Sequence, residues 1–148
     1  MPPPDELAIR ASGPEVQRAV DRMLAAVDIL RRRHEFRGYV HVKLLPGAQR
    51  DQIVEATRVA NRVSVNLEGP RDDVVRGLAR EKDLSGDLLP ALTLAGRLSR
   101  EARLEGQPDR AAPSGTTTQF VVGAQGEGDR EILSLVGRLE GQGLLHHA

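Results

Sequence analysis

Gly38 to Gly47 reads GYVHVKLLPG, an alternation of polar and apolar side chains that is typical of a β-strand with two different faces. The pattern returns in RVSVNLEGP, from Arg62 to Pro70, and in TTTQFVVGA, from Thr116 to Ala124. A segment with helical spacing follows each of these stretches. Strands that alternate with helices pair in parallel through crossover connections. The sequence therefore predicts an α/β fold built on a parallel sheet.

The two faces of these strands differ in polarity. Apolar side chains occupy one parity, namely Val40, Val42, Leu44, Val63, Val65, Leu67, Phe120 and Val122. The other parity carries Tyr39, His41, Lys43, Ser64, Asn66, Glu68, Gln119 and Gly123. Crossover helices can cover the apolar face, whereas bulky branched side chains normally fill the interior of a (β/α)8 barrel. A polar inner face therefore favours a partial (β/α) barrel of parallel strands that holds a polar ligand.

The length of the chain limits the size of that barrel. Its 148 residues fit one domain over residues 1–148. A complete (β/α)8 barrel needs roughly 250 residues, so the chain supplies at most about half of one. Apolar periodicity predicts helices over about 14–33, 49–61, 71–79, 85–102 and 128–140, with Ser85 as the cap of the fourth and a loop over 105–115.

Composition excludes several classes of function. Basic and acidic residues number 21 each, so the chain lacks the basic excess expected of a free-standing nucleic-acid-binding domain. It contains no cysteine, which excludes thiolate-held zinc or iron-sulfur sites within this chain alone. No apolar stretch approaches the roughly 20 residues of a membrane span, and MPPPDEL lacks the regions of a signal peptide. We therefore expect a cytoplasmic protein that does not enter a membrane.

Candidate ligand sites lie in the loops that follow the strands, because barrel sites form at the carboxyl ends of strands. These loops are residues 45–49, 68–72 and 123–128. The third reads GAQGEG, whose small residues let backbone approach a ligand or simply form a tight turn. It matches neither G-x-G-x-x-G nor a P-loop, so no dinucleotide or nucleoside-triphosphate motif supports a site there.

Polar side chains on the inner face need partners, because an unpaired buried polar group costs on the order of 1 to 3 kcal/mol. His41 and Lys43 can contact an anion, or Lys43 can form a salt bridge with Glu68 of the neighbouring strand. Ser64, Asn66 and Glu68 share one face of the second strand, where a ligand or ordered water can pair with them.

Two other clusters have simpler explanations. His146 and His147 lack the further ligands that a metal site requires, so no metal site is predicted. The run Arg31-Arg32-Arg33 ends the first predicted helix, where cations complement the helix dipole.

The order and spacing of GYVHVKLLPGA, RVSVNLEGP and SGTTTQFVVGAQGEGDREIL resemble the barrel of radical S-adenosylmethionine proteins associated with DNA modification or repair. The resemblance covers about Gln17 to the C-terminus and matches barrel strands three to five. Glu6 to Gly13 resembles the strand-two segment more loosely, and Gln142 to Ala148 resembles the start of strand six. The family is often linked to a uracil-DNA-glycosylase-like partner, so the resemblance implies DNA or a nucleotide, and such a protein, as partners.

The resemblance implies S-adenosylmethionine as the cofactor and gives it eight contact positions: Ser12, Gly13, Ser64, Asn66, Glu68, Val121, Gly123 and Ala124. By resemblance, the strand-two positions lie near the methionyl group and the strand-four positions face the cofactor or substrate. The strand-five positions abut the adenine. His41 and Lys43 match the strand-three pattern, with no role assigned to either.

One departure from the family bears on mechanism. Family members hold a 4Fe-4S cluster on a C-x3-C-x2-C loop after strand one, and this chain has neither that loop nor any cysteine. The cluster supplies the electron that cleaves the cofactor to a 5′-deoxyadenosyl radical. The resemblance therefore implies a fragment of a radical S-adenosylmethionine enzyme that is inactive alone. Two alternatives stay open: a non-catalytic module with an adenosine or nucleotide pocket, and a structural remnant without a ligand.

Overall fold

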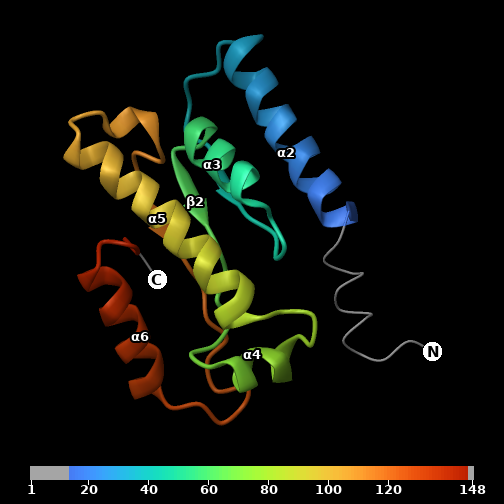
Figure 1. Ribbon diagram of the computed structural model, residues 1–148, viewed down its shortest axis with the longest axis vertical. Coiled ribbons are helices and arrows are strands. Elements are labelled where there is room, and N and C mark those ends of the chain that lie inside the picture. The colour runs from blue at the N-terminus through green and yellow to red at the C-terminus, as the bar shows by residue number, and fades with distance from the viewer. Residues whose placement is uncertain (1–13, 147–148) are drawn as a thin grey trace.

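Three short parallel strands organise the chain in the computed structural model, which describes residues 14–146 (Figure 1). They are β1 (His41–Lys43), β2 (Arg62–Ser64) and β3 (Thr116–Thr117), in the sheet order β1-β2-β3. Both pairings are parallel, which confirms the predicted class of α/β fold. Ser12, Gly13 and His147 lie outside the described residues, as does the loosely matching segment that begins at Glu6.

The helices of the described part of the chain lie close to the predicted positions. They are α2 (Pro14–Arg32), α3 (Arg50–Val59), α4 (Asp72–Leu78), α5 (Leu89–Leu104) and α6 (Asp129–Gly141). A π-helical turn (Leu84–Leu88) leads into α5. A 3-10 turn (Pro108–Arg110) lies within the predicted loop. Pro90 occupies the first turn of α5, where its missing N–H removes no helical hydrogen bond.

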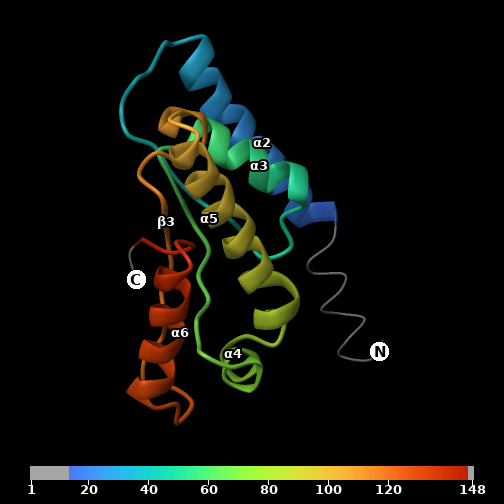
Figure 2. The same ribbon diagram turned by 60° about the vertical axis from the view of Figure 1, so that its left-hand side comes forward.

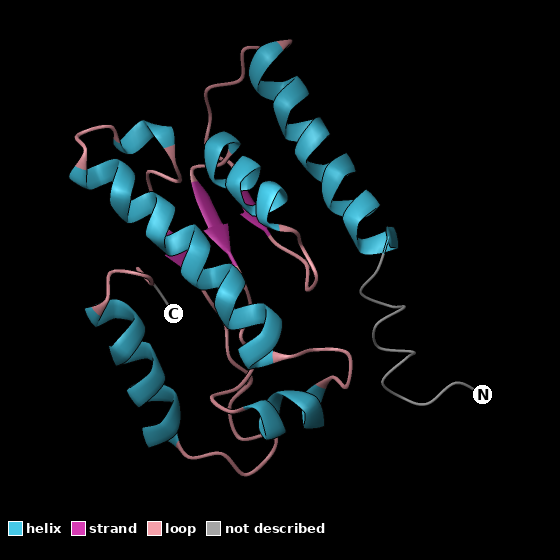
Figure 3. Ribbon diagram, in the orientation of Figure 1, coloured by secondary structure: helices cyan, strands magenta, loops and turns pink. Residues whose placement is uncertain are grey.

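The apolar parity of the strands forms the core beneath the helices. α3 and α5 contact the sheet and each other, and α2 packs on α3. In Figure 1 and Figure 3 the strands lie behind α3 and α5, and in Figure 2 β2 runs alongside α5. The strand side chains of this core are at most 3% exposed: Val42, Leu44, Val63, Val65 and Leu67. The predicted division of the strands into two faces is therefore confirmed for β1 and β2.

The regular ladders are shorter than the predicted strands because a threonine side chain interrupts the pairing of β2 with β3. The Thr118 hydroxyl donates to the carbonyl of Val65 at 2.7 Å. The same oxygen accepts from the N–H of Leu67 at 3.0 Å. Thr118 is 1% exposed, so these bonds replace backbone pairing inside the core.

Pairing resumes beyond this point with a shift of one residue. Ser64 pairs with Thr117 before the interruption, and Glu68 pairs with Phe120 after it. The extra residue on one strand is the mark of a β-bulge. The chain then leaves the sheet, and Val122, which was predicted to face the helices, is 66% exposed. That prediction was wrong because the alternation of faces ends where the pairing ends.

The start of α5 also differs from the prediction. Asp83, and not Ser85, caps the π-helical turn, and its carboxylate accepts from the N–H of Gly86 at 2.9 Å. The hydroxyl and the N–H of Ser85 donate to the carboxylate of Asp72 instead. These bonds hold the pKa of Asp72 below its ordinary value. The cap comes two residues earlier than predicted because the helix opens with a wider turn.

Arg31 joins the end of α2 to the loop before β1 and to the end of α3. Its guanidinium donates to the carbonyls of Val59 at 3.0 Å, Phe36 at 2.9 Å and Gly38 at 2.7 Å. It also donates to Oδ1 of Asn61 at 2.8 Å. The helix-dipole explanation therefore gives only part of what this arginine does, because its bonds also fix the loop that leads into β1.

The segment after α6 returns to the sheet. The N–H of His146 donates to the carbonyl of Thr116 at 3.0 Å, beside β3, in the segment that by resemblance begins a further strand. Leu144 and Leu145 are buried. A Cβ on Gly96 of α5 would overlap the backbone of Leu144, so the segment and the helix approach closely.

Candidate functional site

The sheet face that is not covered by α3 and α5 carries a polar cavity of about 260 Å³. Side chains from the three strands and their continuations line it: His41, Lys43, Ser64, Asn66, Thr117, Thr118 and Gln119. The structure thus brings together the predicted site residues of the first two strands, apart from Glu68. The parity argument missed Thr117 and Thr118, because they belong to the run Thr116–Thr118, in which both faces carry the same residue type.

Neutral polar groups make one part of this cavity. Ser64 is only 4% exposed, whereas Asn66 is half-buried and its Nδ2 donates to Oε1 of Gln119 at 3.2 Å. That bond joins the continuation of β2 to the continuation of β3. An amide pair with remaining donors and acceptors, next to a hydroxyl, can recognise the hydroxyl and amine groups of a polar ligand.

Basic side chains from β1 line the other part of the cavity. His41 and Lys43 project from β1 and are exposed. The pKa of His41 lies below its ordinary value because partial burial disfavours the imidazolium and because Arg62 and Lys43 place further positive charge nearby. His41 is therefore neutral near pH 7 and leaves Lys43 as the charged group on this wall.

Glu68 does not line the cavity, although its sequence parity predicts that it should. Its backbone adopts a left-handed φ of 68°, which breaks the alternation of side-chain directions at the bulge. The carboxylate pairs with Lys82 at 2.7 Å, and both side chains are largely buried. The alternative of a Lys43–Glu68 salt bridge was therefore wrong, because Lys82 already holds this carboxylate.

The loop after β3 is closed by a carboxylate of its own. The Glu127 side chain is 8% exposed and accepts from the N–H of Gly123 at 2.5 Å and from that of Gln125 at 3.0 Å. Bonds from its own N–H and from those of Gln125, Gly123 and Ala124 lower the pKa of Glu127 despite its desolvation. The loop N–H groups that a ligand would use are therefore already engaged.

This arrangement separates the strand-five positions from the cavity. Val121 is 43% exposed, and Gly123 and Ala124 are exposed, but none of these residues lines the polar cavity. Gly123 has a φ of 76°, a backbone conformation that favours glycine, so the turn itself explains this residue. Sequence reasoning missed Glu127; an acidic residue directly after a Gly-x-x-Gly turn was the available signal.

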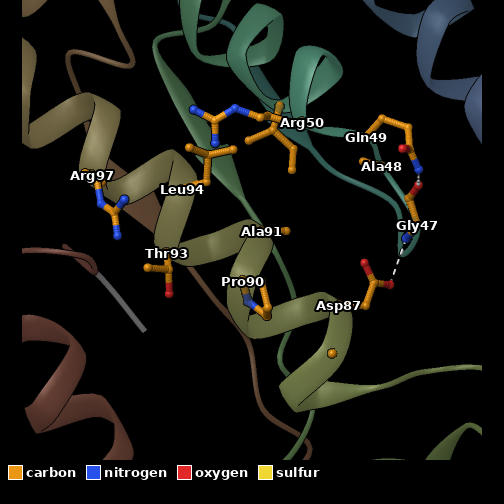
Figure 4. Close-up of a pocket in the computed structure, with 12 residues that line it drawn as sticks. Gly47, Ala48, Gln49, Arg50, Asp87, Pro90, Ala91, Thr93, Leu94 and Arg97 are labelled. Atoms are coloured by element: carbon orange, nitrogen blue, oxygen red, sulfur yellow. Dashed lines mark hydrogen bonds between the residues drawn. The ribbon is translucent and has the colours of Figure 1, made fainter.

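A second cavity of about 520 Å³ lies between α3, α5 and the loop after β1. In Figure 4, Gly47 and Asp87 lie at one end of it and Arg97 projects from α5 at the other. The carboxylate of Asp87 accepts from the N–H of Gly47 at 2.8 Å. Burial raises the pKa of this carboxyl group. Gly47, Ala48 and Gln49 belong to the predicted candidate loop 45–49, whereas no residue that α5 contributes to this cavity was predicted as a site residue.

Comparison with protein-family models, with curated proteins and with solved structures found no match to this chain. The description of the site therefore rests on the structure. Within residues 14–146, no group of three or more His, Asp or Glu side chains is placed to hold a metal ion. No helix in the same range is long and apolar enough to cross a membrane. The ring of His146 pairs with Arg103 at 2.6 Å and with the N–H of Thr116 at 3.1 Å, which explains this histidine structurally.

Proposed function

We propose that the chain is a (β/α)-barrel segment of the radical S-adenosylmethionine type, and that its uncovered sheet face binds S-adenosylmethionine or a related adenosine compound. The observation that carries the proposal is the polar cavity to which all three strands contribute. Polar side chains gathered at a sheet face that no described helix covers favour a ligand over packing. The sequence resemblance supplies the adenosine class of ligand.

The cavity suits part of such a ligand. Ligand pockets commonly measure about 300 to 1,000 Å³, so a cavity of about 260 Å³ holds one polar portion of a nucleoside compound. Asn66 and Gln119 present amide donors and acceptors, which match ribose hydroxyls or adenine nitrogens. Lys43 can pair with a carboxylate. The loop closed by Glu127 is not needed for these contacts.

A 4Fe-4S cluster does not fit this chain. Clusters of this kind are held by cysteine thiolates, and the chain has none. The proposal therefore assigns no radical step to these residues. A parent reaction in DNA modification or repair, with DNA or a nucleotide and a uracil-DNA-glycosylase-like protein as partners, would need a cluster held elsewhere.

Ligand-observed NMR with S-adenosylmethionine and with adenosine tests the proposal. We expect saturable binding with a dissociation constant of roughly 0.1 to 1 mM, equivalent to about 4 to 5.5 kcal/mol. Asn66→Ala should weaken binding about threefold or more, because it removes the amide on the cavity wall. Gln107→Ala, an exposed amide in the 105–115 loop, is the matched control and should bind normally.

Two outcomes would contradict the proposal. One is the absence of a saturable signal for either compound. The other is equal binding by the wild type and Asn66→Ala. Gly123→Val is not a useful test, because any side chain at a φ of 76° strains the turn whether or not a ligand binds there.

A further inference from the structure

We infer that the polar cavity takes a phosphorylated nucleoside, with the phosphate beside Lys43 and His41 and the nucleoside toward Asn66. This inference rests on the proposed function and specifies in addition that the ligand carries a negatively charged phosphate. Its starting point is the distribution of charged side chains around the cavity, which the resemblance does not address.

The cations on this face have no acidic partner among the described residues. Within residues 14–146, no ion pair involves Lys43 or Arg62. The guanidinium of Arg62 donates to the carbonyl of Ser114 at 3.1 Å, a neutral acceptor that leaves its charge in place. Lys43 and Arg62, on either side of the neutral ring of His41, therefore make this part of the face electropositive.

The carboxylate best placed in sequence to neutralise this face is withdrawn from it. Glu68 follows β2 on the polar parity, but its left-handed backbone breaks the alternation of side-chain directions. Its carboxylate pairs with Lys82 at 2.7 Å. A cavity wall that keeps a lysine while the nearby acid is paired elsewhere favours an anionic ligand. The Nδ2 and Oε1 groups of the Asn66–Gln119 pair are uncharged and suit the nucleoside part.

The charge of the whole chain favours a small nucleotide over a nucleic acid. Its formal net charge is zero, so the chain lacks the basic excess typical of a domain that binds a run of phosphates. A cavity of about 260 Å³ matches one phosphate and part of one nucleoside. Among phosphate-bearing ligands, a nucleoside monophosphate is the one that these dimensions and charges describe.

NMR titrations that compare adenosine with adenosine 5′-monophosphate (AMP) at low ionic strength test the inference. We expect AMP to bind about three- to fivefold more tightly than adenosine, the gain typical of one exposed charge pair. Lys43→Gln should abolish this difference without weakening adenosine, and 0.5 M salt should reduce it. Arg18→Gln, which removes an exposed cation on α2, should keep the full difference.

The ring resonances of His41 give a second readout. A bound phosphate adds negative charge beside this ring, so AMP should raise the measured pKa of His41 and adenosine should not. A His41→Asn variant identifies the resonances. Inorganic phosphate should produce a smaller shift in the same direction.

The outcomes separate this inference from the proposed function. Equal affinity for AMP and adenosine would overturn the inference and leave adenosine binding intact. A phosphate-induced shift of His41 without any adenosine binding would support the anion site and overturn the adenosine assignment. If a single-stranded oligonucleotide bound far more tightly than AMP, the ligand would be a nucleic acid and the inference of a small nucleotide would be overturned.

Discussion

Arg31 shows how one side chain can position a loop that has little structure of its own. The residues between α2 and β1 include Phe36 and Gly38, whose carbonyls accept from its guanidinium, and the ring of Phe36 lies 5.8 Å from the guanidinium carbon. Val59 and Asn61 bind the same group from the end of α3. The loop therefore depends on a planar donor with several N–H groups in fixed directions.

Arg31→Ala should lower the free energy of unfolding by about 2 to 3 kcal/mol, because several carbonyls lose their donor in a partly buried position. Arg31→Lys should recover only part of this loss, since an ammonium cannot reach acceptors in all these directions. Urea unfolding followed by circular dichroism measures the effect. Arg33→Ala, at an exposed neighbouring position, should change stability by less than about 0.5 kcal/mol, and an equal loss there would contradict the explanation.

The carboxylate of Glu127 should make the stability of the protein depend on pH. Its pKa is lowered in the folded protein, so its contribution to stability is complete above the unfolded pKa of about 4.3 and is lost as pH falls through the folded pKa. Glu127→Gln should be less stable than the wild type at pH 7, and the gap should narrow as the pH falls toward 3. Urea unfolding at both pH values checks this. A Glu127→Gln gap that stays constant down to pH 3 would rule out the carboxylate as its cause.

At the scale of elements, the helices were predictable and the strand ends were not. Apolar spacing predicted α2, α3 and α6 to within two residues, because a helix repeats one pattern over several turns. The pairing of β2 with β3 ended early because a single hydroxyl, that of Thr118, replaced two backbone partners. Nothing in the alternation of side chains distinguishes such a threonine from an ordinary strand residue.

A pair of helical glycines tests the packing of elements. Gly96→Ala should destabilise the protein by about 1 to 3 kcal/mol, because the new methyl group overlaps the backbone of Leu144. Gly137→Ala on α6 meets nothing within 4 Å and should stabilise the protein by about 0.5 to 1 kcal/mol through helix propensity. Thermal and urea unfolding compare the two. If both substitutions stabilised the protein, the close approach of α5 to the C-terminal segment would be wrong.

For the whole molecule, the site was predictable where it follows strand parity. His41, Lys43, Ser64 and Asn66 meet in one cavity because alternation and parallel pairing fix their faces. Glu68 leaves the alternation of faces because its backbone adopts a left-handed torsion. Glu127 closes the loop after β3 because the turn brings its carboxylate to the N–H of Gly123. Neither can be read from periodicity, because both depend on where the chain leaves the sheet.

The outer edge of β1 should affect how molecules associate. The N–H of Leu44 and the carbonyl of Val40 bond toward β2, so the backbone groups of His41 and Lys43 point to an edge that no described strand covers. We expect weak, concentration-dependent self-association, because such edges pair with other strands. Tyr39→Lys, at the start of this edge, should reduce it, whereas Leu133→Lys on α6 should not. Analytical ultracentrifugation decides this, and a monomer at all concentrations would refute it.

The one-residue bulge at Thr118 affects where residues can be deleted from the chain. Between Ser64 and Glu68 the second strand holds one residue more than the third strand holds between Thr117 and Phe120. Deleting one residue between Ser64 and Glu68 would equalise the two spans, but it would break the alternation that buries Val65 and Leu67. Deleting a residue from the facing part of β3 would widen the mismatch. In relatives of this protein, deletions should therefore be rare on both sides of this pairing.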